Sequence, residues 1–387
     1  MNAPPFSLSS GLLPTAPTGA VRVRLDPWQA WGTPERRAAW QALADAATTP
    51  NPFFEPWYLL PSCEAFDQSG KVRLLTLEIG GELIGLLPLA APGRYGRWPL
   101  PHLTTWLHPN AFLGAPLVRA GCEMLFWQAA FDWIDDHCAT ALFLHLPAMP
   151  LEHPLAHALF DVALPEDRKA ALVMRQQRAM LHSPLPPDLY LERALPGKKR
   201  KELRRQHTRL AEQGELRFER DEGTAGLPEW IEAFLDLENR GWKGANGSAL
   251  ASSPATATLF RQSLAGAAAL GKLERLSLNL DGRPIAMLAN FLTAPGSFSF
   301  KTAFDETYAR FSPGVLLQRE NLALLACREI QWCDSCAAPD HPMIDSLWTE
   351  RRPIGRISVA IGGALRRAAF NALLALELGR NPTGIAQ

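Results

Sequence analysis

The chain alternates short apolar runs with amphipathic stretches, which is the pattern of a mixed α/β protein. Apolar residues at every second position predict strands, and apolar residues at every third or fourth position predict helices. Thr33 followed by Pro34 is a typical helix start. In the first half we expect strands at 21–25, 72–79, 83–89, 141–146 and 171–181, and helices at 33–47, 53–66, 122–137 and 154–164.

A proline-rich boundary at 183–187 separates the first half from the second, because Ser-Pro-Leu-Pro-Pro continues neither a helix nor a strand. The alternation then resumes. Here we expect helices at 188–195, 198–213, 228–240, 255–270 and 312–330, and strands at 216–219, 273–280, 284–292, 298–304 and 332–336. An apolar helix at 362–380 is expected to pack on the C-terminal domain or on a second copy of the chain.

The two halves repeat one order of elements. Residues 77–86 align without a gap on residues 278–287, and each segment contains a turn of two residues with glycine, Gly80-Gly81 or Asp281-Gly282. Such turns favour tight hairpins because both residues can adopt positive φ. We therefore expect an α/β fold with a mixed sheet in which one domain occurs twice, at 20–183 and 186–387, after a disordered tail at 1–19.

Composition excludes several classes of protein. Among 387 residues, 39 Lys and Arg balance 39 Asp and Glu, so no overall charge favours a nucleic acid partner. The first residues lack the basic and apolar regions of a secretion signal, and no apolar run is long enough to cross a membrane. The six cysteines are scattered, which is typical of reduced thiols. These features predict a cytoplasmic protein without transmembrane segments.

The sharpest local motif is Arg310-Phe311-Ser312-Pro313-Gly314-Val315, which joins the expected strand at 298–304 to a helix. Ser312 suits an N-cap and Pro313 suits the first helical turn. Free amides and the positive end of the helix dipole, next to a cation, would suit a diphosphate. The alternative is that Ser-Pro-Gly only caps the helix, and neither a Walker loop nor a dinucleotide glycine motif is present.

Polar residues next to this motif are candidates for binding a substrate. Lys301 and Asp305 lie on one side of the strand at 298–304, where they would line a cleft or an exposed face. Glu238, Trp242 and Lys243 end a helix and enter a loop, where they would hold a polar substrate or only pack as a helix end.

Candidate proton acceptors follow the strand at 332–336. His341 and Asp345 would serve as general bases, and Asp305 is a third candidate, since histidine titrates near neutral pH. Asp340 is the expected cap of the helix that begins there. Cys333 and Cys336 have the spacing of a metal-binding pair, but no second pair lies nearby, so no metal is expected.

A basic run at 198–209 holds seven cations and one acid, Glu202. Such a helix is often only a solvated surface, and its functional alternatives are an anionic substrate, coenzyme phosphates or RNA.

Five ordered stretches of the second half form a specific pattern when they are taken together. They are residues 195–205, 241–244 (Gly-Trp-Lys-Gly), 281–286 (Asp-Gly-Arg-Pro-Ile-Ala), 300–306 (Phe-Lys-Thr-Ala-Phe-Asp-Glu) and 308–314 (Tyr-Ala-Arg-Phe-Ser-Pro-Gly). In these stretches the second half resembles the CelD-type acetyltransferases associated with cellulose and exopolysaccharide synthesis, a branch of the GNAT superfamily. The first half resembles the same family more loosely, at 51–56 and 112–117.

The resemblance implies two tandem GNAT-like domains, as in the FemX-like aminoacyltransferases, with acyl-CoA as co-substrate. The turn at 310–314 would grip the coenzyme diphosphate, although Arg-Phe-Ser-Pro-Gly departs from the usual Arg/Gln-x-x-Gly-x-Gly/Ala loop. A backbone amide of the strand before Asp305 would hold the thioester oxygen. The first domain would shape the cleft without binding the coenzyme, and a homodimer is possible.

The expected reaction is direct attack of an amine or hydroxyl on an acyl thioester, with a small or glycan-related acceptor. The rivals are an aminoacyl-tRNA-dependent ligase that grips RNA with the basic run, and a non-catalytic assembly protein of a polysaccharide system. Neutral net charge weighs against the RNA alternative.

Overall fold

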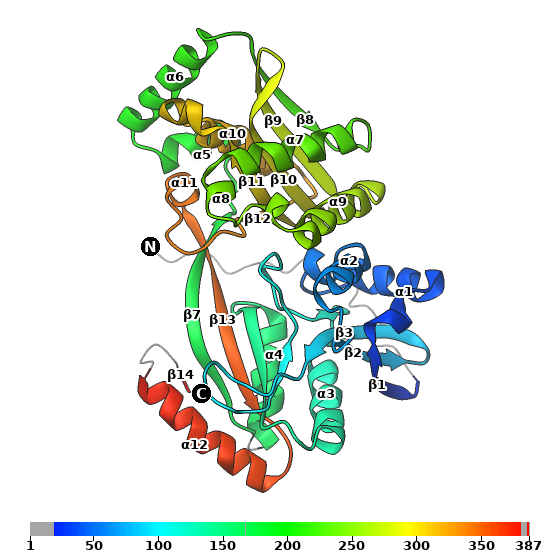
Figure 1. Cartoon of the computed structure of the whole chain (residues 1–387). Helices are drawn as coiled ribbons and strands as arrows, with labels where there is room; N and C mark the ends of the chain where they lie inside the picture. The colour runs from blue at the N-terminus through cyan, green and yellow to red at the C-terminus, as the bar shows by residue number, and fades with distance from the viewer. Residues whose placement is uncertain (1–18, 167, 381–384, 387) are drawn as a thin grey trace.

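The computed structural model describes residues 19–166, 168–380 and 385–386, and these residues form one mixed sheet of fourteen strands with helices on both faces (Figure 1). Most of the expected tail at 1–19 therefore lies outside the described residues. The expected fold class is confirmed, because strands and helices alternate through both halves in the same order.

The first half contains seven strands and four α-helices among the described residues. The strands are β1 (Val21–Pro27), β2 (Arg73–Ile79), β3 (Glu82–Ala90), β4 (Leu103–Thr105), β5 (Leu117–Val118), β6 (Phe143–Pro150) and β7 (Ala170–Leu181), and the helices are α1 (Pro34–Asp45), α2 (Pro56–Phe66), α3 (Glu123–His137) and α4 (Pro154–Ala163). Thr33 caps α1 with Pro34 at its first position, as predicted.

The second half adds its own strands and helices after residue 186. The strands are β8 (Leu216–Asp221), β9 (Leu273–Leu280), β10 (Arg283–Thr293), β11 (Gly296–Phe304), β12 (Trp332–Asp334), β13 (Glu350–Ala360) and β14 (Ile385–Ala386). The helices are α5 (Pro187–Ala194), α6 (Gly197–Ala211), α7 (Leu227–Arg240), α8 (Trp242–Ala245), α9 (Pro254–Ala269), the 3-10 helices η5 (Glu306–Phe311) and η6 (Leu322–Ala326), α10 (Pro313–Asn321), α11 (Pro342–Asp345) and α12 (Ala364–Arg380).

The strand order is nearly symmetric about its centre. It reads β1-β2-β3-β4-β6-β13-β7-β12-β11-β10-β9-β8, so strands at equal distance from the middle correspond, such as β1 with β8 and β4 with β11. β5 and β14 lie off this path, because β5 pairs with β3 and β14 pairs with β7. At the centre β13 pairs with β6 of the first half, and β7 pairs with β12 of the second. The halves therefore exchange their last long strands, and β7 and β13 pair with each other along the seam (Figure 1).

Each half contains one short pair of parallel strands among the described residues. β11 is nine residues long but pairs with β12 only through Gly296, Ser297 and Phe298. β4 and β6 pair in parallel over two positions in the equivalent place. β12 ends at Asp334, opposite Phe298, so the second half of β11 has no described strand on this side, which leaves an opening in the strand pairing.

One hydrophobic core extends across both halves. Trp57 of α2 packs on Phe291 of β10 with ring centroids 4.9 Å apart, and Phe53 contacts Phe300 of β11. On the other face of the second half, α6 and α10 cover a separate cluster that includes Leu278. The halves are therefore held together by buried aromatic contacts as well as by the exchanged strands.

Two expectations about helices are wrong. The expected helix at 312–330 ends as α10 at Asn321, and the 3-10 helix η6 follows from Leu322. The residue that precedes α11 is His341, not the expected cap Asp340, which has φ 60°. α12 packs on β13 of the second half, as expected, and also on β6 and β7 of the first half, where Tyr95 donates a hydrogen bond to Glu377 at 2.7 Å. No described helix is long and apolar enough to span a bilayer.

Candidate functional site

Lys301 lies on the part of β11 that has left β12, and its amine contacts the first half of the chain. Nζ donates a hydrogen bond to Oδ1 of Asn110 at 2.7 Å and lies 5.2 Å from the ring of Phe112 and 5.5 Å from that of Phe300. Among the described residues no carboxylate forms an ion pair with this amine. Burial, aided by the Lys243 ammonium, lowers the pKa of Lys301 to about 8, and Glu238 and Cys336 act in the opposite direction.

Buried Glu238 and half-buried Lys243 form an ion pair close enough to influence the pKa of Lys301. Lys243 Nζ lies 2.7 Å from Oε1 of Glu238, and the other carboxylate oxygen accepts from the amide of Leu250 at 2.7 Å. Together with Trp242, Thr302 and Glu306 they line a small cavity of about 40 Å³ at the end of β11. Three of the four expected substrate-binding residues, Glu238, Trp242 and Lys243, therefore line one cavity, and Trp242 is exposed. Lys301 is not among the lining residues, since its amine lies against Asn110 and Phe112.

The start of α10 differs from the expected cap. Ser312 has φ 53° and makes no side-chain capping bond, and its carbonyl accepts the amides of Val315 at 2.9 Å and Leu316 at 3.0 Å. A Cβ added to Gly314 would lie 2.8 Å from Sδ of Met343, so the chain itself covers this residue. The expectation of free, exposed amides at the start of this helix is therefore wrong, because the amides of Ser312, Val315 and Leu316 are hydrogen-bonded within the chain and Gly314 is buried.

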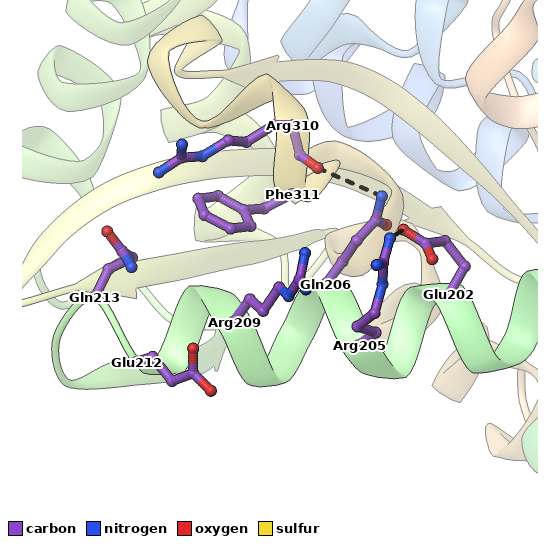
Figure 2. Close-up of a pocket in the computed structure, with 8 residues that line it drawn as sticks. All are labelled: Glu202, Arg205, Gln206, Arg209, Glu212, Gln213, Arg310 and Phe311. Atoms are coloured by element: carbon purple, nitrogen blue, oxygen red, sulfur yellow. Dashed lines mark hydrogen bonds and ion pairs between the residues drawn. The ribbon is translucent and has the colours of Figure 1, made fainter.

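A basic pocket lies on the other side of this turn, between α6 and η5. It measures about 280 Å³, and Figure 2 shows α6 along one wall with Arg310 and Phe311 opposite. Three arginines line it: Arg205, Arg209 and Arg310. The remaining lining residues are Glu202, Gln206, Glu212, Gln213 and Phe311.

Two of the three arginines in this pocket, Arg209 and Arg310, form no ion pair with any described residue, although Glu202 and Glu212 also line it. Arg205 Nη2 lies 2.7 Å from Glu202, while Gln206 Nε2 donates to the carbonyl of Arg310 at 3.4 Å and links the two walls (Figure 2). Arg310 lies over the Phe311 ring at 4.6 Å. An unsatisfied cluster of guanidinium groups in a concave site is suited to an oligoanion such as a diphosphate.

The three expected proton acceptors occupy different surroundings. The Asp305 carboxylate accepts from Thr307 N at 2.9 Å and Oγ1 at 2.6 Å, and so caps η5. Asp345 forms an ion pair with Arg351 at 3.2 Å. Nδ1 of His341 is buried without a hydrogen-bond partner among the described residues, which leaves it able to accept one.

A buried ion cluster lies behind the opening. Asp334 is fully buried and contacts Arg178 at 3.3 Å and Arg352 at 2.9 Å. Burial alone would raise the pKa of Asp334, but the two arginines outweigh it and the pKa falls below its ordinary value. Cys333 and Cys336 are buried nearby as free thiols, and among the described residues no group of metal-ligating side chains is arranged to hold an ion.

Sequence reasoning missed Asn110. It lies 191 positions from Lys301, and no pattern in the chain couples the two residues. Phe112 was identified only as part of the segment 112–117 that loosely resembles the same family, and its contact with Lys301 was not predicted. The strand exchange was equally invisible, because the repeat predicts two similar domains and not which strand completes which one.

Comparisons with known proteins concern the family and the fold. Residues 197–341 match the family described as "Acetyltransferase (GNAT) domain". No curated protein sequence matches the chain significantly. Among solved structures, FemX superposes with a TM-score of 0.55 at 10% identity, covering 83% of this chain and 95% of FemX.

Two other structures share the fold. A conserved protein of unknown function from Bacteroides thetaiotaomicron gives a TM-score of 0.52 at 10% identity, over 84% of this chain and 97% of that one. The C-terminal domain of a protein named as a lysylphosphatidylglycerol synthetase from Agrobacterium fabrum gives 0.50 at 14% identity, over 89% and 95%. At these identities the likeness concerns the fold alone. Residues 197–341 of this chain are therefore similar to GNAT acetyltransferase domains, and the chain as a whole shares the fold of these solved structures.

Proposed function

We propose that this protein transfers an acyl group from acyl-CoA to an amine or hydroxyl of a small or glycan-related acceptor. The observation that supports this proposal is the basic pocket of Arg205, Arg209 and Arg310 beside η5, at the end of the strand that carries Lys301. Because the amides of α10 are used or covered, arginine side chains and not backbone amides grip the coenzyme phosphates in this proposal.

The acceptor binds near Lys301, Glu238, Lys243 and Trp242 in this proposal. Its nitrogen or oxygen attacks the thioester carbonyl carbon, the carbon–sulfur bond breaks, and coenzyme A leaves as a thiolate that takes up a proton. Holding both reactants in line supplies most of the rate gain. The Lys301 amine, held at 2.7 Å by Asn110, orients the polar part of the acceptor.

We assign the proton acceptor to His341 in preference to Asp305 and Asp345. Asp305 caps η5 and Asp345 is paired with Arg351, so both carboxylates already have partners. Nδ1 of His341 has none among the described residues, and the neighbouring Met343 touches the turn that ends at Gly314. His341→Ala is expected to lower kcat by about 10²-fold or more, the usual size of general-base catalysis, while acetyl-CoA affinity stays unchanged.

The donor site is tested by reversing charge in the pocket. Arg209→Glu combined with Arg310→Glu is expected to weaken acetyl-CoA binding at least about 100-fold, because two charge-assisted contacts are replaced by repulsion. Isothermal titration calorimetry measures the affinity. Arg328→Glu, at an exposed site on the same half, is the matched control and should bind as the unchanged protein does. Equal affinities for the double variant and the control would contradict the proposed donor site.

A second candidate is aminoacyl transfer from an RNA carrier. The cationic surface continues past the pocket into a shallow depression of about 490 Å³ lined by Lys198, Lys201, Glu202 and Arg205, which is more surface than a diphosphate needs. Isothermal titration calorimetry with acetyl-CoA and with aminoacyl-tRNA, each alone and in the presence of the other, shows which ligand binds and so separates the two candidates. Binding of neither ligand would favour a non-catalytic assembly role.

A further inference from the structure

The Lys301 amine is held by a residue of the other half of the chain. Asn110 belongs to the connection between β4 and β5, and it is 7% exposed. Lysine amines at binding sites are commonly paired with carboxylates, but this one meets an amide oxygen at 2.7 Å. An amide accepts the hydrogen bond without adding charge, so it orients the amine and leaves its titration free to respond to burial.

Asn110 is itself fixed in place by its neighbours. Tyr58 Oη donates to the main-chain carbonyl of Asn110 at 2.5 Å, and the main-chain N–H of Asn110 donates to Nδ1 of His108 at 3.3 Å. Burial, and to a lesser degree Lys301, lowers the pKa of His108 to about 3, so its imidazole is neutral and Nδ1 can accept. The backbone of Asn110 is therefore fixed, which places its side-chain oxygen against the amine.

The connection between β4 and β5 is also held at Phe112, through the buried ion cluster of Asp334, Arg178 and Arg352. Arg178 Nη1 donates to the carbonyl of Phe112 at 2.8 Å, and Arg178 is in turn paired with Asp334. Phe112 lies under the Lys301 amine. The segment from His108 to Phe112 is thus anchored at both ends and carries two groups that contact Lys301.

The equivalent segment of the second half has a different role. In the strand correspondence β4 matches β11, so the connection after β4 matches the connection that contains η5 and the basic pocket. In the first half the connection at this position carries Asn110, which contacts Lys301 of the second half. We propose that Asn110 is a positioning residue for the Lys301 amine, so that the site of the C-terminal half is completed by the N-terminal half. This inference rests on the proposed acyl transfer.

The test follows the titration of Lys301 directly. The chain has only eight lysines, so ¹³Cε-lysine NMR resolves them, and the signal missing from Lys301→Met identifies Lys301. In the unchanged protein the midpoint is expected near pH 8. The other groups that face the amine are Glu238 and Lys243 from α7 and α8, Cys336 after β12, and His108, and all stay unchanged in the variants.

Asn110→Asp places a carboxylate where the amide oxygen lies and is expected to raise the midpoint by about one to three pH units. Asn110→Ala removes the acceptor and is expected to lower it. Asn371→Asp, an exposed change of equal charge on α12, should leave it unchanged. In acyl transfer from acetyl-CoA, the alkaline limb of kcat/KM should move with the NMR midpoint.

The possible results separate the two proposals. A wild-type midpoint in both Asn110 variants would overturn the inference. If the Lys301 midpoint shifts but no acyl-CoA supports transfer, the proposed function is wrong, while the contact between Asn110 and Lys301 is confirmed. Thermal melting identifies a variant that fails to fold, and Asn110→Gln, which keeps the amide, then serves as the milder change and is expected to shift the midpoint less than Asn110→Asp does.

Discussion

Neither half of the chain is expected to fold when it is produced alone, for example as residues 19–183 or 184–387. β7 belongs to the first half but lies between β13 and β12 of the second, and β13 lies between β6 and β7. Each isolated half would lose the partners of its last strand and expose a long unpaired edge. It would also expose the aromatic contacts between α2 and β10. We expect aggregation, and no cooperative unfolding transition in urea, for either half.

The two halves produced together are the control for the cut. The cut lies in the proline-rich connection between β7 and α5, which contributes to neither element, so the mixture should assemble into a complex of native size. Size-exclusion chromatography and circular dichroism measure this. A cooperative transition of normal stability for residues 184–387 alone would show that the exchanged strands are dispensable.

Asp334→Ala is expected to destabilise the protein by about 3–5 kcal/mol, the usual cost of removing one partner from a buried ion pair. The carboxylate is fully buried between Arg178 and Arg352, and its removal leaves two buried guanidinium groups without their counter-charge. The carboxylate also accepts the amide of Cys336 at 2.9 Å. Urea unfolding monitored by tryptophan fluorescence measures the change.

An exposed ion pair provides the comparison. Asp236 pairs with Arg240 on the surface of α7 at 3.0 Å, and Asp236→Ala should cost less than about 1 kcal/mol. A loss of similar size for Asp334→Ala would show that its buried pairs contribute little. Asp334→Asn keeps the shape without the charge and is the variant to use if the alanine variant does not fold.

The contribution of Asp334 should depend on pH in a defined direction. Its pKa is lower in the folded state than the ordinary value of about 3.9, so the folded state holds the charged form more strongly. The stabilisation is therefore complete above about pH 5 and is lost as the pH falls through the folded-state pKa. Asp334→Asn should remove this part of the acid dependence, and an unchanged acid limb would contradict the assignment.

The repeat of elements was predictable because it is written in local patterns. The hairpin turns at Gly80-Gly81 and Asp281-Gly282 have φ of 57° and 88°, and 49° and 74°, as such turns require. The cap at Thr33 and the strand at 298–304 depend equally on neighbours in the chain. The basic run at 198–209 could also be recognised in the sequence. The sequence did not show that Arg310 and Phe311 lie opposite this helix and complete a pocket with it.

The start of α10 shows the limit of local reasoning. Ser-Pro-Gly has the composition of an exposed helix cap, yet Ser312 adopts positive φ and Met343 of α11 covers Gly314. The packing of a segment about thirty residues later decided which amides are accessible. The place expected for the diphosphate thus shifted from backbone amides to the arginines beside them.

By itself the sequence determined the α/β class, the doubling of one fold and the residue types gathered near β11, because periodicity and turn chemistry act over a few residues. Only the tertiary structure decided that the halves exchange their last strands, that Lys301 meets Asn110, and that Asp334 is neutralised by two arginines. These contacts join residues far apart in the chain, and their energy depends on burial that no local pattern records.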